Sequence, residues 1–113
     1  MWTPDGHRLI FSSQRTGAGN LFWQAADGTG AVERLTASPN AQNPASVSPD
    51  GRRLIFTEFP PTTRQDVIMQ VGLDGTHLVT PLVQSSFSER NGIVSPDGRW
   101  LAYEANDSGR FEI

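Results

Sequence analysis

Short apolar runs, separated by polar and glycine-rich segments, make up most of the chain. Three of them, residues 9–11, 54–56 and 101–103, are apolar at consecutive positions and rich in residues that favour strands. Such runs are typical of strands whose sheet is covered on both faces. A second set, residues 20–23 and 67–71, follows after a polar segment, and no stretch has the apolar spacing of an amphipathic helix. The pattern predicts an all-β protein.

A four-residue phrase, Ser or Thr followed by Pro-Asp-Gly, stands shortly before each run of the first set. Proline presets φ for a turn, and aspartate can hydrogen-bond the backbone two residues further on. The phrase therefore predicts a tight turn between two strands. Its copies recur after 45 and 47 residues, as the numbering of the prolines shows. The predicted structural turn residues are Pro4, Asp5, Gly6, Pro49, Asp50, Gly51, Pro96, Asp97 and Gly98.

A strand-rich repeat of this period is typical of β-propeller blades, which are four-stranded antiparallel sheets that need neighbours to bury their faces. Asp-Gly pairs at 27–28 and 74–75 predict hairpins inside the blades, with further strands at 33–36 and 78–83. We expect innermost strands at 43–48 and 91–95. Propellers usually have about four to eight blades, whereas this chain holds about two and a half. The predicted units are residues 1–42, a blade lacking most of its innermost strand; 43–89, a complete blade; and 90–113, a blade truncated where its third strand starts.

Charge and composition exclude several classes of partner and site. The net charge is −3, and the nine basic residues are spread along the chain, so we expect no nucleic-acid partner. No segment approaches the about 18 apolar residues of a membrane helix, and the first residues lack a signal-peptide pattern. The absence of cysteine excludes disulfides and thiolate metal sites but leaves the cellular location open.

No catalytic or metal-binding constellation emerges from the sequence. The chain has no Gly-x-Ser-x-Gly nucleophile motif, and its two histidines, His7 and His77, occupy unrelated positions. The recurring aspartates lie in separate turns, whereas calcium needs six to eight oxygens in one pocket. Glu58 and Glu104 end equivalent strands rather than forming an acid–base pair. We therefore predict no catalytic residues, no metal and no cofactor.

One polar cluster is a candidate for binding a protein, a peptide or a small ligand. It lies where the chain crosses into the innermost strand of the next blade, near the mouth of the central channel, and loops there carry binding residues in many propellers. The alternative is that crossover loops are polar only because they are solvated. The cluster comprises Gln42, Asn43, Glu89, Arg90 and Asn91.

The order of these features resembles the TolB-type, WD-like propeller repeat over essentially the whole chain: the Pro-Asp-Gly phrase, the apolar trio, a Ser/Gly loop, Asp-Gly, and the Arg-Leu-Thr segment at 34–36. The resemblance implies a non-catalytic bacterial scaffold that binds protein partners, in a periplasmic or extracytoplasmic location. Residues 84–91 and 95–113 are most similar to repeats in extensions of bacterial Ser/Thr protein kinases. Two alternatives stay open: a sensor-like extension of such a kinase, or the propeller part of a prolyl-oligopeptidase-like or tricorn-like serine peptidase.

An incomplete propeller exposes apolar blade faces and unpaired strand edges, which favour association with another chain. We therefore expect a homo-oligomer, and the repeat count favours a dimer that closes a ring of about five blades. Phe22 and Trp23 are adjacent on one predicted strand and must face opposite sides of the blade. At least one of them should pack against the neighbouring blade; an exposed Trp23 would mark an interface.

Overall fold

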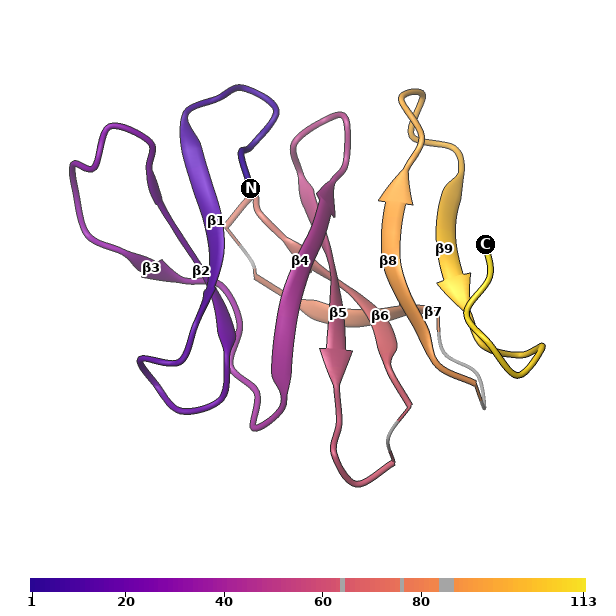
Figure 1. Ribbon diagram of the computed structural model, residues 1–113. Coiled ribbons are helices and arrows are strands. Elements are labelled where there is room, and N and C mark those ends of the chain that lie inside the picture. The colour runs from indigo at the N-terminus through magenta and orange to yellow at the C-terminus, as the bar shows by residue number, and fades with distance from the viewer. Residues whose placement is uncertain (64, 76, 84–86) are drawn as a thin grey trace.

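Three antiparallel sheets lie side by side in the chain (Figure 1). The computed structural model describes residues 1–63, 65–75, 77–83 and 87–113, and over these ranges it contains nine strands and no helix. The first sheet consists of β1 (Arg8–Ser13), β2 (Asn20–Ala25) and β3 (Glu33–Arg34), and the middle sheet of β4 (Ala41–Val47), β5 (Arg53–Phe59), β6 (Val67–Gly72) and β7 (Val79–Val83). The third sheet pairs β8 (Glu89–Val94) with β9 (Leu101–Ala105). The all-β prediction is confirmed, and strands that follow each other in the sequence are neighbours in each sheet.

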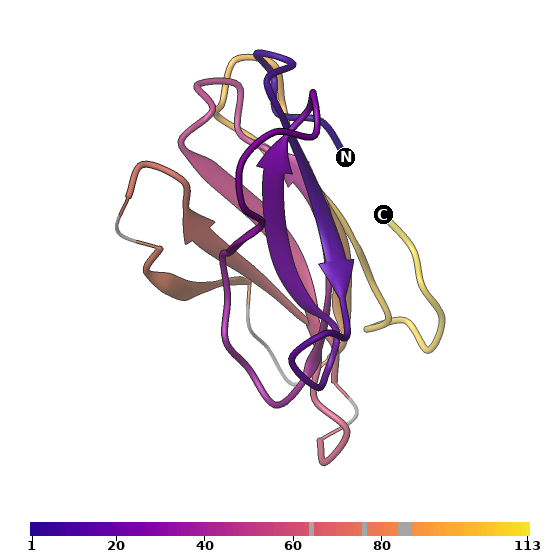
Figure 2. The ribbon, with the colours of Figure 1, turned by 90° about the vertical axis from the view of Figure 1, so that its left-hand side faces the viewer.

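The sheets are stacked face to face, with the first strand of each on the same side of the molecule. In the turned view of Figure 2, the later strands of the middle sheet extend away from β1. Strand pairing repeats the same register: Trp2 lies opposite Leu9, Val47 opposite Leu54, and Val94 opposite Leu101. Residues 1–2 therefore pair with β1 as the end of β4 pairs with β5.

Some boundaries differ from those expected. β4 and β8 each begin two residues earlier than the predicted inner strands. β3 ends at Arg34, two residues before the predicted end, although the amide of Leu35 still donates to the carbonyl of Leu21 at 2.8 Å. The sheets begin near the predicted blade boundaries, but the division into blades remains a prediction. Residues 84–86, within the segment that carries the kinase-type resemblance, lie outside the described residues.

The main apolar core lies between the first and middle sheets. Ile10, Leu21 and Trp23 on one side meet Leu54 and Phe56 on the other, and all five are buried. Trp23 is only 8% exposed, so the prediction that one of the two adjacent aromatics packs against the neighbouring sheet is confirmed. This tryptophan belongs to the core.

The opposite face of the middle sheet is covered by the third sheet. Ile55 and Ile68 are fully buried there, and a Cβ added to Gly92 of β8 would lie 3.0 Å from Cγ2 of Ile55. The middle sheet is thus covered on both faces, which is why residues 54–56 are apolar without alternation.

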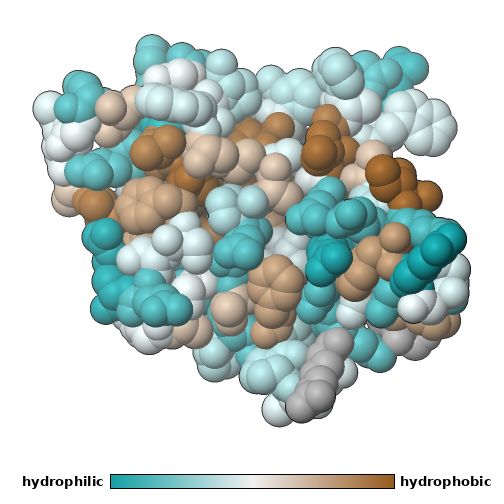
Figure 3. Space-filling view, viewed as in Figure 1, coloured by the Kyte–Doolittle hydropathy of each residue, from teal (hydrophilic) through white to brown (hydrophobic). Residues whose placement is uncertain are grey.

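The first and third sheets leave large apolar side chains in solvent. Trp2 is 61% exposed, Ile93 59% and Trp100 74%. In the space-filling view of Figure 3, brown apolar atoms reach the surface on the right-hand side, where β8 and β9 lie. Exposed apolar surface of this kind favours association with a partner.

Candidate functional site

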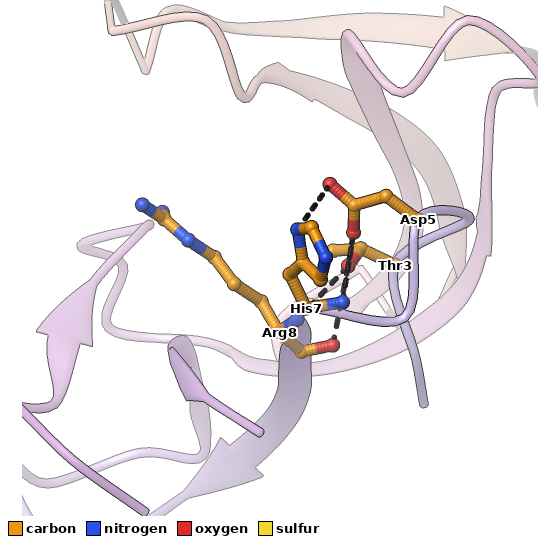
Figure 4. A network of polar contacts seen from close by, with 4 residues as sticks. All are labelled: Thr3, Asp5, His7 and Arg8. Atoms are coloured by element: carbon orange, nitrogen blue, oxygen red, sulfur yellow. Dashed lines mark hydrogen bonds and ion pairs between the residues drawn. The ribbon is translucent and has the colours of Figure 1, made fainter. Parts of the chain in front are cut away.

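The three Pro-Asp-Gly phrases form the same hydrogen-bonded turn. In each, the Ser or Thr hydroxyl donates to Oδ1 of the aspartate at 2.6 Å. The same Oδ1 accepts the backbone amide two residues further on, at 2.9 Å in the first turn and 3.0 Å in the other two. The glycines have φ of 72°, 74° and 76°, a conformation that glycine adopts without strain. Figure 4 shows the first turn, with Thr3, Asp5 and His7 drawn together.

These hydrogen bonds stabilise the ionised form of the turn aspartates. The side-chain hydrogen bond from Thr3, Ser48 or Ser95 is the main cause that lowers the pKa of Asp5, Asp50 and Asp97, and the backbone amide lowers it further. Each turn therefore presents an ionised carboxylate at neutral pH.

The predicted cluster of Gln42, Asn43, Glu89, Arg90 and Asn91 lies within β4 and β8, and the expectation that it occupies crossover loops is wrong. The crossovers end earlier because the amides of Gln42 and Glu89 bond to the preceding sheet, at the carbonyls of Gly19 (2.7 Å) and Asp66 (2.9 Å). Gln42 and Glu89 are therefore already part of the inner strands.

Gln42 is buried rather than available to a ligand. Its Oε1 accepts the hydroxyl of Thr36 at 2.5 Å, and its Nε2 donates to Oε1 of Glu58 at 2.8 Å. Glu89, at the equivalent position of the next repeat, is also buried. Both residues belong to the contact between sheets, so the structure does not bring the five residues together on one surface.

Asn43 and Asn91 are the exposed members, and they adjoin the same threonine. Asn43 lies opposite Thr57 in the β4–β5 register, while the backbone amide of Asn91 donates to Oγ1 of Thr57 at 3.2 Å. Asn43 and Asn91, on neighbouring inner strands, thus both lie next to Thr57, and both are exposed.

Arg90 and Asn91 converge on Glu104 of β9. Arg90 Nε lies 3.5 Å from Oε2 of Glu104, and Nδ2 of Asn91 donates to the same oxygen. The Arg90 guanidinium also lies over the Phe111 ring, 3.5 Å from its centroid. Sequence reasoning missed these partners of Arg90, although Glu104 lies directly opposite it in the β8–β9 register.

A second candidate site lies between the first two turns. We call it the first turn crevice; it has a volume of about 580 Å³ and is lined by Pro4, Asp5, Arg8, Trp23, Asp50 and Leu73, among others. The Arg8 guanidinium lies 3.9 Å from the centroid of the Trp23 ring, and Nε1 of Trp23 donates to Glu33 at 2.8 Å. The repeat of the turn was visible in the sequence, but the space between two copies was not.

A smaller crevice lies beside the second turn, with no residue of the third turn in its lining. This second turn crevice, of about 310 Å³, is lined by Asp50, Arg52, Arg53, Gln70, Asp74 and Leu78, among others. Arg53 takes the place of Arg8, and Gln70 that of Trp23. Arg53 Nη1 donates to Oε1 of Gln70 at 3.1 Å, whereas Arg8 stacks on an indole.

Within the described ranges, no group of three or more His, Cys, Asp or Glu side chains is arranged to hold a metal ion. His7 Nδ1 lies 3.7 Å from Oδ2 of Asp5, and His77 Nε2 lies 3.7 Å from Oε1 of Glu33. A helix suited to crossing a membrane is likewise not found in that part of the chain.

Comparison with known proteins places the chain among propellers. No family model matches it, and neither does any curated protein. Among solved structures it is similar to a protein assigned as TolB from Agrobacterium tumefaciens, with 27% identity and a TM-score of 0.78, covering 98% of this chain and 39% of that one. It is also similar to TolB from Acinetobacter baumannii, with 26% identity and a TM-score of 0.79, covering 98% of this chain and 27% of that one.

These likenesses confirm the β-propeller prediction and the TolB-like character of the fold. The chain spans less than half the length of either TolB protein, and its open row of sheets is an incomplete propeller. The peptidase and kinase-extension alternatives remain predictions.

Proposed function

We propose that the chain is a non-catalytic propeller segment that binds a protein or peptide partner through the surface around Asn43 and Asn91. The observation that carries the proposal is that these two exposed residues, on neighbouring inner strands, both adjoin Thr57. Amide side chains both donate and accept hydrogen bonds, as binding to a peptide backbone requires. Asn91 is held in place by Thr57, which accepts its backbone amide, and by Glu104, which accepts its side-chain amide and pairs with Arg90.

The similarity to TolB proteins supports a protein-interaction role, because the fold is shared over 98% of the chain. The absence of a catalytic constellation from the sequence agrees with such a role. The periplasmic or extracytoplasmic location rests on the same resemblance and remains part of the proposal.

The test is selection of peptides from a random 12-mer phage library on the immobilised chain. Enriched peptides are then measured by calorimetry against the wild type and the double variant Asn43→Ala, Asn91→Gly. Glycine is used at 91 because Asn91 has φ of 57°, where alanine would strain the backbone. We expect binding to the double variant to be at least about tenfold weaker, the effect of losing roughly 1.4 kcal/mol of hydrogen bonding. Arg52→Ala, an exposed change in a turn, is the control; equal affinity for all three proteins would refute the assignment.

We also propose that the chain forms a homo-oligomer, in which the outer face of the third sheet packs on a second copy. Exposed Ile93 and a shallow apolar hollow of about 260 Å³ beside it, lined also by Ala102 and Tyr103, support this. Asn91 and Glu104 line the same hollow, so packing of a second copy there would compete with a peptide bound at Asn91. Light scattering after size exclusion should give at least twice the mass of one chain, and Ile93→Glu should lower it. A wild type that is monomeric and unfolds cooperatively at micromolar concentration would overturn the proposal.

A further inference from the structure

The first turn crevice has the size and lining of a side-chain pocket. Its volume of about 580 Å³ falls within the about 300–1,000 Å³ usual for ligand sites. Trp23 and Leu73 provide apolar wall, and the prolines of the two turns flank it. Both Trp23 and Leu73 are 8% exposed, so they form part of a packed core and hold the crevice open at fixed positions.

We propose that the first turn crevice binds an arginine side chain of a protein partner, with the guanidinium between Asp5 and Asp50 and the aliphatic stem against Leu73 and the prolines. The inference rests on the proposed protein-interaction role but concerns a different surface from Asn43 and Asn91. Arginine suits the site because its stem packs on apolar surface while its planar head pairs with carboxylates.

The charges that face the crevice are unbalanced. Asp5 and Asp50 contribute two carboxylates, and Arg8 contributes one cation. Arg8 extends away from Asp5 in Figure 4, and its guanidinium lies on the Trp23 ring. The turn bonds of both aspartates fall on Oδ1, so Oδ2 of Asp50 takes no part in them. Counted over its lining residues, the crevice has two carboxylates and one cation, and Arg52 and Arg53 lie near Asp50 outside this lining. The excess carboxylate in the lining favours a cationic group.

The second turn crevice is smaller and has a different setting. It lies between the second turn and residues 70–78, not between two turns, and its volume is about 310 Å³. Its lining holds two carboxylates, Asp50 and Asp74, and two cations, Arg52 and Arg53. An incoming guanidinium would find no excess of carboxylates among these lining residues.

The experiment is an NMR titration of the isotope-labelled chain with the peptide Ac-Ala-Arg-Ala-NH₂. The indole N–H signal of Trp23 reports from the crevice wall, and the signals of Trp2 and Trp100 serve as references outside it. Three outcomes together support the proposal: a saturable shift of the Trp23 signal, a loss of most of that shift with the isosteric neutral peptide Ac-Ala-citrulline-Ala-NH₂, and weaker binding by the double variant Asp5→Asn, Asp50→Asn. We expect the double variant to weaken binding about 3- to 10-fold, because each exposed ion pair contributes modestly.

Asp97→Asn is the matched control, because Asp97 makes the same turn bonds but does not line the first turn crevice. It should leave the titration unchanged. Equal shifts with the arginine and citrulline peptides, or no shift of Trp23 with either, would overturn the proposal. That comparison needs only the wild-type chain, so a double variant that failed to fold would still leave the proposal testable. If phage-selected peptides bind at Asn43 and Asn91 while Trp23 stays unmoved, the crevice assignment alone fails.

Discussion

Gly92 separates two expectations about the contact between the middle and third sheets. Ala45 occupies the equivalent position of the preceding repeat, and both residues lie at a register irregularity in their inner strand. Judged from the sequence alone, Gly92→Ala gives the third sheet the same residue that the preceding repeat has at Ala45. It should then stabilise the fold by about 0.4–1 kcal/mol, because alanine restricts the unfolded chain.

The packing around Gly92 predicts the opposite result. A Cβ at Gly92 would lie 3.0 Å from Cγ2 of Ile55, 3.3 Å from Cγ2 of Ile68 and 3.3 Å from Cδ1 of Leu101. Ile55 and Ile68 are fully buried, so neither can move aside without disturbing the core. Overpacking of this kind costs about 1–3 kcal/mol, which exceeds the gain from the unfolded state. We expect a net loss of about 1–2 kcal/mol.

Thermal unfolding followed by circular dichroism measures this loss. In a domain of about 100 residues, 1 kcal/mol shifts Tm by roughly 5 °C, so Gly92→Ala should lower Tm by about 5–10 °C. Combining it with Leu101→Val, which lacks Cδ1, should reduce the penalty relative to the Leu101→Val protein alone. A Tm equal to or above that of the wild type would refute the packing argument.

Four further predictions concern polar groups. Ser48→Ala removes a buried hydroxyl that donates to Asp50 and accepts the amide of Arg53. Urea denaturation should therefore show a free energy of unfolding lower by about 1 kcal/mol. Ser95→Ala should lower it less, because Ser95 is more exposed. The pKa of Asp50 is lowered by the bond from Ser48, so the stabilising effect of its carboxylate is present above the pKa of an unfolded aspartate and is lost as the pH falls below about 4. The difference in unfolding free energy between the wild type and Ser48→Ala should therefore shrink in acid. A difference that stays constant with pH would contradict the assignment. Burial raises the pKa of Asp66, so its charged form disfavours the fold at neutral pH. Asp66→Asn should therefore raise the free energy of unfolding by about 0.5 kcal/mol or less at pH 7 and should not change it in acid. Melting curves of the two proteins at both pH values measure this difference. Gln42→Glu places a second carboxylate beside Glu58, which should cost about 2–3 kcal/mol at pH 7 and less at pH 4, whereas the exposed change Gln14→Glu should be neutral in the same denaturation assay.

Much of the candidate binding surface was identifiable in outline but not in detail. Asn43 and Asn91 were singled out by their place in the repeat, and both are exposed. The position of Gln42 in the repeat predicts the same role, yet its side chain bridges Thr36, which follows β3, and Glu58 of the middle sheet. A polar residue in an inner strand has the same appearance in a sequence whether it faces solvent or a neighbouring sheet.

The strands, their turns and the repeat follow from the sequence itself, because each depends on residues close together in the chain. Within one phrase, Ser48, Asp50 and Gly51 hold both the hydrogen bonds and the backbone angle that the turn requires. Contacts between sheets depend on residues about one repeat apart, such as Ser46 and Gly92, whose hydrogen bond spans 46 positions. Their spacing is decided only when whole sheets pack. For this reason the tertiary structure alone revealed the burial of Gln42, the tight surroundings of Gly92 and the crevice between the first two turns.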